Sequence, residues 1–228
     1  MSDRSRIWVV VAAYNEATVI AKVVADVRTA GYSLVVVDDG STDGTADAAA
    51  AAGAIVVRHP INLGQGAALQ TAIEFALSRG AEIIVTFDAD GQHRASDING
   101  MVEALAQNDA DFALGSRFLH QESTNASQAR RLVLKAATWF TRLTTGLRIS
   151  DTHNGLRAMT RRGANAIHLR QNRMAHASEI LHQIASSGLK YVETPVMIEY
   201  SAYSLAKGQK LSDAFMILVD LFARRLHR

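Results

Sequence analysis

The sequence predicts an α/β protein in which a mostly parallel sheet carries helices on both faces. Short apolar runs alternate with longer segments of helical periodicity through the first half of the chain. The apolar runs are almost continuous rather than alternating, which is typical of strands buried on both faces. Polar clusters follow three of these runs, at the position where open α/β sheets bind ligands.

The apolar runs, rich in Val and Ile and bounded by Gly or Asp, predict five strands. These strands are expected over residues 7–13, 34–37, 54–58, 83–88 and 112–114. Helices are expected between them, over residues 17–30, 43–52, 62–78 and 96–106. Gly31 ends the first helix, and Gly53 and Gly80 end the next two. The second helix is Ala-rich, and Ser41 or Thr42 can cap its start.

Carboxylates gather where three of the predicted strands end. Tyr14-Asn15-Glu16 follows the first strand, Asp38-Asp39 follows the second, and Asp88 and Asp90 follow the fourth. Since the carboxyl ends of parallel strands lie on one edge of a sheet, the three clusters should converge. Asp88 and Asp90 repel each other unless a cation lies between them, and Mg²⁺ or Mn²⁺ takes carboxylate and phosphate oxygens. With Gln92 as a third oxygen donor, this turn predicts a metal-bound phosphate site; the alternative is a solvent-exposed turn.

Composition limits the class of protein. The chain has 228 residues, which is typical of one domain, and half of them are hydrophobic. There is no cysteine, so neither disulfides nor thiolate chemistry is expected. The polar start leads straight into a strand, which is unlike a signal peptide. No stretch reaches the roughly 18 apolar residues of a spanning helix, so the protein is not expected to cross a membrane.

Charge divides the chain into two halves. Residues 1–117 hold 8 Lys/Arg and 15 Asp/Glu, a net charge of −7, whereas residues 118–228 hold 16 Lys/Arg and 7 Asp/Glu, a net charge of +9. The basic half predicts an anionic partner, such as lipid, a phosphate-bearing substrate or nucleic acid; a solvated basic face is the alternative. Two amphipathic helices are expected in this half, over 128–147 and 211–226, and they either lie at a membrane surface or pack into the core.

The ordered motifs resemble the GT-A glycosyltransferases of family 2, and within them the polyprenyl-phosphate sugar synthases similar to dolichyl-phosphate mannose synthase. The resemblance runs from Val9 to about Lys210. It implies a Rossmann-like GT-A domain over residues 1–228, with a nucleotide-sugar and metal half (1–117) and an acceptor and membrane-facing half (118–228). The carrying segments are residues 13–16, 37–45, 62–66, 88–93, 115–117, 151–157 and 208–210. Two residues depart from the family pattern, Ala12 in place of Pro and Gln209 in place of Ser.

The resemblance also implies a role for each matched residue. Asp88, Asp90 and Gln92 would surround Mg²⁺ or Mn²⁺ on the donor diphosphate. The residues implied in nucleotide-sugar binding are Ala13, Tyr14, Glu16, Asp38, Asp39, Gly64, Asp88 and Ala89. Those implied in binding donor and acceptor phosphates are Arg117, Arg131, Arg157 and Lys210. The residues expected to act in catalysis are Asp90, Arg117, Asp151 and Arg157.

The implied reaction is an inverting, metal-dependent transfer of a sugar from a UDP- or GDP-sugar to undecaprenyl or dolichyl phosphate. It would take place at the inner face of the cell membrane, with the enzyme bound peripherally or through a small membrane protein. Nucleic acid is not expected as a partner. One alternative is a family-2 enzyme that acts on a saccharide acceptor in cell-surface or cell-wall polysaccharide assembly, with Asp151 or Glu179 as the base. A D-x-D phosphatase is a distant alternative, because its motif expects Thr after the Gly and here Gln92 follows Gly91.

Overall fold

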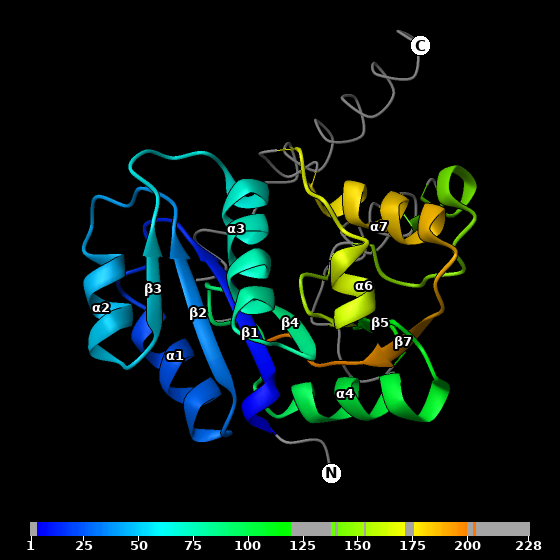
Figure 1. Cartoon of the computed structure of the whole chain (residues 1–228), viewed down its shortest axis with the longest axis horizontal. Helices are drawn as coiled ribbons and strands as arrows, with labels where there is room; N and C mark the ends of the chain where they lie inside the picture. Colours follow the sequence, from blue (N-terminus) through cyan, green and yellow to red (C-terminus); the bar gives the residue numbers. More distant parts are fainter. Residues whose placement is uncertain are drawn as a thin grey trace, which may run out of the picture.

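The fold is built around one seven-stranded sheet with helices on both sides (Figure 1). The computed structural model describes residues 4–119, 138–139, 141–152, 154–171, 176–199 and 203. The strands are β1 (Ile7–Ala13), β2 (Ser33–Asp38), β3 (Ile55–Arg58), β4 (Ile83–Asp88), β5 (Phe112–Ser116), β6 (Arg157–Thr160) and β7 (Tyr191–Pro195). The helices are α1 (Ile20–Thr29), α2 (Thr45–Ala51), α3 (Gln65–Ser78), α4 (Asp97–Asn108), α6 (Arg161–Asn165) and α7 (His176–Ser187), after a 3-10 turn at Arg4–Arg6.

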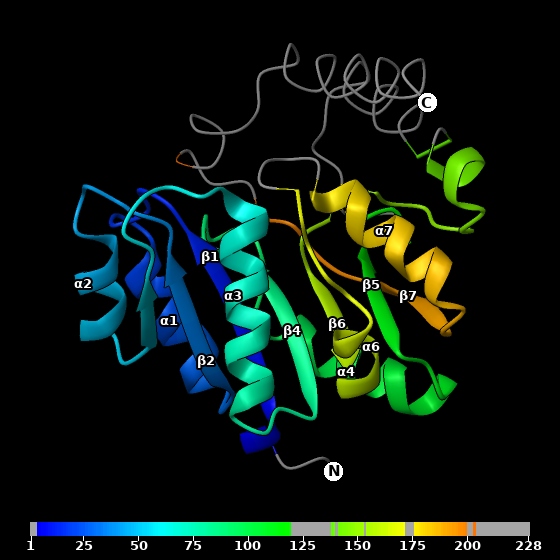
Figure 2. The same ribbon diagram turned by 45° about the horizontal axis from the view of Figure 1, so that its top comes forward.

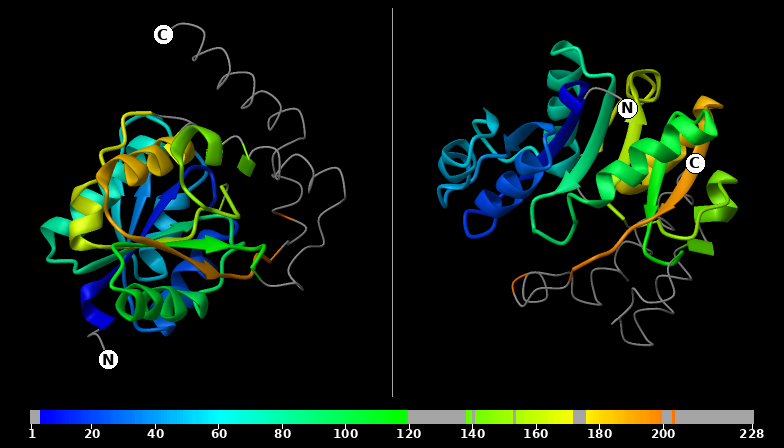
Figure 3. Two further views of the ribbon diagram at one scale, coloured as in Figure 1. Left: turned by 90° about the vertical axis from the view of Figure 1, so that its right-hand side faces the viewer. Right: turned by 90° about the horizontal axis from the view of Figure 1, so that it is seen from below.

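The strand order is β3-β2-β1-β4-β6-β5-β7, and every pairing is parallel except those of β6. β6 runs antiparallel between β4 and β5. The views in Figure 3 show β7 beside β5 at the edge of the sheet. The mostly parallel α/β sheet predicted from the sequence is therefore confirmed, with one inserted antiparallel strand.

Two hydrophobic cores lie on opposite faces of the sheet. Val9 and Val11 of β1 belong to the core under α1 and α4, whereas Trp8 and Val10 belong to the core under α3 and α7. Figure 2 shows α3, α6 and α7 in front of the sheet and α1 and α4 behind it. The central strands are nearly fully buried because both of their faces are covered, which explains the continuous apolar runs in the sequence.

Several boundaries differ from the sequence expectations. The helix expected over 17–30 begins only at Ile20. The expectation that Ser41 or Thr42 caps the second helix is wrong, because α2 starts after Gly44, at φ 82°, without a side-chain cap. Ser41 instead accepts a hydrogen bond from the backbone N–H of Asn15 at 2.9 Å. The fifth strand extends to Ser116, so Arg117 directly follows its end.

The predicted helix over 128–147 is described only at residues 138–139 and 141–147, and residues 138–139 and 141–145 are helical. Trp139 and Leu143 lie one turn apart, and they are 66% and 64% exposed. These two residues do not pack into the core, and the other residues of the predicted stripe lie outside the described residues. Arg131, Lys210 and the helix predicted over 211–226 lie outside the described residues. Within the described part of the chain, none of the helices has the length and hydropathy needed to cross a membrane.

Candidate active site

The three polar clusters converge at the carboxyl edge of the sheet. Ala13 of β1 is level with Asp38 of β2, and Ala12 is level with Asp88 of β4. The strands that precede the clusters therefore end side by side. The convergence predicted from the sequence is confirmed by this register.

Hydrogen bonds tie the loops after β1 and β2 together. Asn15 has a positive φ of 53°, a conformation that Asn tolerates better than most residues. Its side-chain oxygen accepts the N–H of Thr42 at 3.0 Å, while the N–H of Glu16 donates to the buried Thr45 hydroxyl at 2.8 Å. The Glu16 carboxylate accepts from the hydroxyl of Tyr203 at 2.8 Å. These bonds fix Glu16 where the two loops meet. Tyr14, in the same loop as Glu16, is 46% exposed.

Asp39 faces the loop after β3 rather than the solvent. Its carboxylate accepts the backbone N–H groups of Leu63 and Gly64 at 2.9 and 2.7 Å and is only 2% exposed. His59 Nδ1 contacts the same carboxylate at 2.8 Å, and His59 Nε2 contacts the hydroxyl of Thr71 at 3.0 Å. Asp39 therefore shapes the loop that contains Gly64. Sequence reasoning missed His59, because the pairing depends on the packing of β3 against β2.

Asp88 and Asp90 form the acidic centre of the site. The Asp90 carboxylate accepts the N–H of Gln92 at 3.0 Å. Burial and the neighbouring charge of Asp88 raise the pKa of Asp90 to about 6. Burial also pushes the pKa of Asp88 upward, but His93 and the nearby positive charges outweigh it and hold that pKa below its ordinary value. The two carboxylates thus have the mutual repulsion that a cation would relieve.

The donor set fits Mg²⁺ or Mn²⁺. Both ions take oxygen ligands, and both accept one or two carboxylates completed by substrate phosphates and water. No group of three or more His, Cys, Asp or Glu side chains with metal-binding geometry occurs among the described residues. The protein would therefore supply a partial shell through Asp88 and Asp90, and a diphosphate would supply further oxygens.

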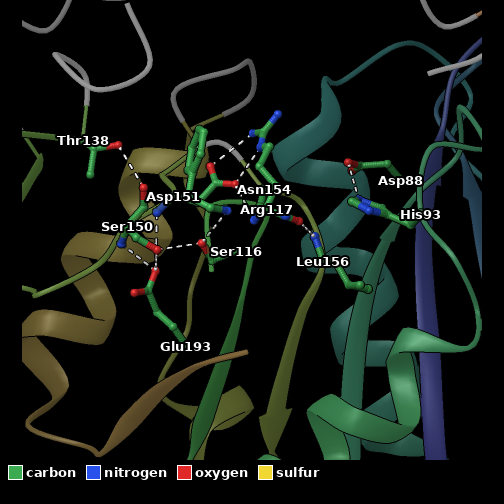
Figure 4. A network of polar contacts seen from close by, with 11 residues as sticks. Asp88, His93, Ser116, Arg117, Thr138, Ser150, Asp151, Asn154, Leu156 and Glu193 are labelled. Atoms are coloured by element: carbon green, nitrogen blue, oxygen red, sulfur yellow. Dashed lines mark hydrogen bonds and ion pairs between the residues drawn. The ribbon is translucent and has the colours of Figure 1, made fainter. Parts of the chain in front are cut away.

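His93, Gly155 and Arg157 surround Asp88. His93 Nε2 contacts the Asp88 carboxylate at 2.9 Å (Figure 4). A Cβ added to Gly155 would lie 2.2 Å from an Asp88 oxygen, so any larger residue there would displace the Asp88 carboxylate from this position. Arg157 is level with Thr86 of β4, two residues before Asp88. Burial lowers the pKa of Arg157, and the negative charges of Asp88 and Asp151 oppose this shift. The sequence motif contained Gly155, but its close approach to Asp88 follows only from the structure.

Arg117 and Asp151 form a buried ion pair at the end of β5. Arg117 Nε and Nη2 donate to the two Asp151 oxygens at 2.6 and 3.1 Å. Their side chains are 8% and 1% exposed. Arg157 starts the neighbouring strand β6, where it is level with Leu114 of β5, three residues before Arg117. The positions of Arg131 and Lys210 relative to this pair fall outside the described residues.

Glu179, the other candidate base, lies in the first turn of α7. Its carboxylate accepts the backbone N–H groups of Arg170 at 3.1 Å and Gln171 at 2.9 Å. The structural role weighed for this residue at the helix start therefore has direct support. Gly66, in the first turn of α3, packs against the same segment, because a Cβ there would lie 2.0 Å from the Gln171 carbonyl oxygen.

Comparison with known families identifies the chain. The family profile described as glycosyl transferase family 2 matches residues 8–167, which run from the second residue of β1 through β6 and include all three clusters. The chain belongs to glycosyl transferase family 2. It is a glycosyltransferase, and the phosphatase alternative is excluded by this membership.

Three relatives match this glycosyltransferase over nearly its whole length. An uncharacterised protein of Methanocaldococcus jannaschii is 36% identical over 98% of this chain and 94% of its own. The UDP-N-acetylglucosamine–dolichyl-phosphate N-acetylglucosaminyltransferase of Methanococcus voltae is 28% identical over 99% of this chain and 98% of its own. The polyprenol monophosphomannose synthase of Mycolicibacterium smegmatis is 31% identical over 94% of this chain and 86% of its own.

Solved structures confirm the GT-A fold. Glucosyl-3-phosphoglycerate synthase from Mycobacterium tuberculosis, in complex with Mn²⁺, UDP-glucose and phosphoglyceric acid, has a TM-score of 0.72 at 20% identity. The match covers 98% of this chain and 80% of that one. The same synthase with Mg²⁺ and UDP gives a TM-score of 0.73. At this identity the likeness concerns the fold alone.

Proposed function

We propose that this glycosyltransferase moves a sugar from a UDP- or GDP-sugar to a polyprenyl phosphate, with inversion at the anomeric carbon and with Mg²⁺ or Mn²⁺ on the donor diphosphate. The names of the relatives support the acceptor class, since they include transferases to dolichyl phosphate and undecaprenyl phosphate. The expected small membrane partner has no support from these relatives and stays a prediction.

The observation that carries the choice of acceptor is the engagement of both candidate bases. A sugar hydroxyl must give its proton to a base as it attacks. Asp151 is bound in a bidentate manner by Arg117, and Glu179 accepts two backbone N–H groups. A phosphate oxygen is already ionised near neutral pH and needs no base. This arrangement favours a phosphate acceptor over a saccharide acceptor.

On the donor side, Asp88 and Asp90 would hold the cation, which when bound neutralises charge on the departing diphosphate. Tyr14, Glu16 and the loop that Asp39 braces would bind the nucleoside. Ala13, Asp38, Gly64 and Ala89 would line the same pocket, and Gln92 would complete the metal turn.

On the acceptor side, Arg117 and Arg157 would bind phosphate oxygens. A guanidinium suits this task because it donates two parallel hydrogen bonds in a fixed plane. Arg131 and Lys210 would add positive charge. The exposed Trp139 and Leu143 would bring this side to the membrane surface, at the cytoplasmic face where the lipid phosphate lies.

The test measures nucleotide release from a panel of UDP- and GDP-sugars with Mn²⁺, with and without undecaprenyl phosphate. Release that requires the lipid, favours one donor and stops with chelator would support the proposal. Release that responds to a saccharide but not to the lipid would favour the polysaccharide alternative. Product configuration, measured by NMR, tests inversion separately.

A further inference from the structure

Glu193 joins three parts of the chain around the acceptor side, although no motif contains it. One carboxylate oxygen, Oε1, accepts three hydrogen bonds (Figure 4). The N–H and the hydroxyl of Ser150 donate to it at 2.6 and 2.9 Å, and the N–H of Asp151 donates at 3.4 Å. Glu193 therefore holds the chain at the residue next to Asp151 and at Asp151 itself.

A chain of hydroxyl groups continues from this carboxylate to β5. The Ser150 hydroxyl donates to Glu193, so its oxygen must accept from the hydroxyl of Ser116, which lies 2.6 Å away. The oxygen of Ser116 in turn accepts the N–H of Phe118 at 3.2 Å. A carboxylate can only accept, and this fixes the direction of every donor in the chain. The end of β5 and residue 150 are thereby held in one relative position.

The network encloses the ion pair on both sides. Ser116 precedes Arg117, and Ser150 precedes Asp151. The N–H of Arg117 also donates to the Asp151 carboxylate at 3.3 Å. Two neighbouring backbone positions are thus fixed by Glu193 and the two serines, while the side chains that follow them form the bidentate pair.

We propose that Glu193 is a positioning residue for transfer, which acts through Ser150 and Asp151 to hold the Arg117 guanidinium where it binds the acceptor phosphate. This inference rests on the proposed function of Arg117. Bidentate phosphate binding depends on the orientation of the guanidinium plane, and a displacement of about 1 Å in an active site can cost roughly 100-fold in rate. Oε1 of Glu193, in β7, accepts the three hydrogen bonds that would hold the Arg117 guanidinium in this orientation.

Two variants test this role. Glu193→Leu removes the acceptor, and Glu193→Gln keeps a carbonyl oxygen that can still accept. We expect the Leu variant to lower kcat/KM for undecaprenyl phosphate about tenfold or more, whereas the Gln variant keeps it within about threefold of wild type. The affinity for Mn²⁺ with UDP or with GDP, measured by calorimetry, should stay unchanged in both, because Asp88 ends β4 and Asp90 follows it, and β6 and β5 separate β4 from β7.

Glu82→Leu is the matched control. Glu82 precedes β4, at the opposite end of that strand from Asp88, and pairs with Arg6 at the surface. The Glu82→Leu variant should leave both kcat/KM for undecaprenyl phosphate and the affinity for the nucleotide unchanged. Ser150→Ala is a milder change that can be used if Glu193→Leu does not fold. It should lower kcat/KM for undecaprenyl phosphate about threefold or more. The melting temperature of each variant is measured alongside.

Each outcome separates the two proposals. The positioning role is supported if Glu193→Leu loses transfer to the lipid but still binds the nucleotide, and if Glu193→Gln retains transfer. Equal losses for lipid and nucleotide, or wild-type lipid kinetics in Glu193→Leu and Ser150→Ala, would overturn it and leave the proposed function standing. Wild-type enzyme without any lipid-dependent release would overturn the proposed function, and the positioning role with it.

Discussion

Replacing Asp90 with Asn should have opposite effects on stability and on activity. The raised pKa of Asp90, about 6 against an ordinary value of 3.8, means that the folded protein disfavours its ionised form. The difference of about 2 pKa units corresponds to about 3 kcal/mol, since one unit is 1.36 kcal/mol. This value is an upper bound for the stability that the ionised carboxylate removes from the metal-free protein.

The sign of the effect depends on pH. Above pH 6 the folded chain carries ionised Asp90 beside Asp88 and pays this cost in full, whereas below about pH 4 Asp90 is protonated in both folded and unfolded chains. Asp90→Asn removes the charge at every pH and keeps an oxygen that can accept the N–H of Gln92. The variant should therefore be more stable than wild type at pH 8, and the difference should vanish towards pH 4.

Thermal unfolding in the presence of chelator measures this difference. For a chain of this size, about 3 kcal/mol corresponds to a rise in melting temperature of up to about 10 °C. Mn²⁺ should raise the melting temperature of wild type and not that of the variant, and the variant should lose at least about 100-fold in turnover. Asp109→Asn is the control, because Asp109 is exposed and has a positive φ of 46° that Asn tolerates. A variant that is less stable than wild type at pH 8, or active without change, would refute this account of the acidic centre.

Three further predictions concern other parts of the site. His59→Ala deprives a buried carboxylate of a partner and should lower the free energy of unfolding by about 1–3 kcal/mol in a denaturant titration; an unchanged midpoint would contradict the role of this contact. Gly155→Ala places a Cβ against Asp88 and should reduce activity at least about tenfold, whereas Gly100→Ala, with open space in α4, should be neutral or stabilising by up to about 1 kcal/mol; equal activity in the two variants would argue against the close approach. Trp139→Ala removes a 66% exposed ring and should weaken flotation with anionic vesicles, and flotation equal to wild type would leave that ring without a membrane role.

Local signals in the sequence were sufficient for the first half of the fold. The strand over 83–88 has the predicted bounds, since a continuous apolar run that ends in Asp needs no distant partner to be recognised. The three clusters at the sheet edge follow from strand direction alone. The capping of α2 could not be predicted in the same way, because Ser41 is drawn to Asn15, 26 residues earlier in the chain.

The second half depends on contacts between distant residues. β6 has the sequence Arg-Ala-Met-Thr, without a run of β-branched residues, and it becomes a strand because β4 and β5 pair with both of its sides. Glu193 lies in a short strand that carries no motif, and its partners are about 42 residues away in the chain. Its proposed role depends on the position of the loop before β6, which no periodicity in the sequence indicates.

The reversed direction of β6 explains how the Arg117–Asp151 pair is joined to the Asp88 turn. A strand that runs antiparallel in this sheet must begin at the edge where the parallel strands end, so the segment before it crosses the active edge. The described residues 150–152 and 154–157 belong to that crossing: Ser150 is held by Glu193, Asp151 binds Arg117, Gly155 lies against Asp88, and Arg157 starts the strand. Thr86 of β4 donates its hydroxyl to the Gly155 carbonyl oxygen at 2.6 Å and holds the middle of the crossing to the strand that carries Asp88. A shift of this segment would therefore move the Arg117–Asp151 pair and the residue packed against Asp88 together. Under the proposed function, this one short stretch of backbone would set the distance between the donor and acceptor phosphates.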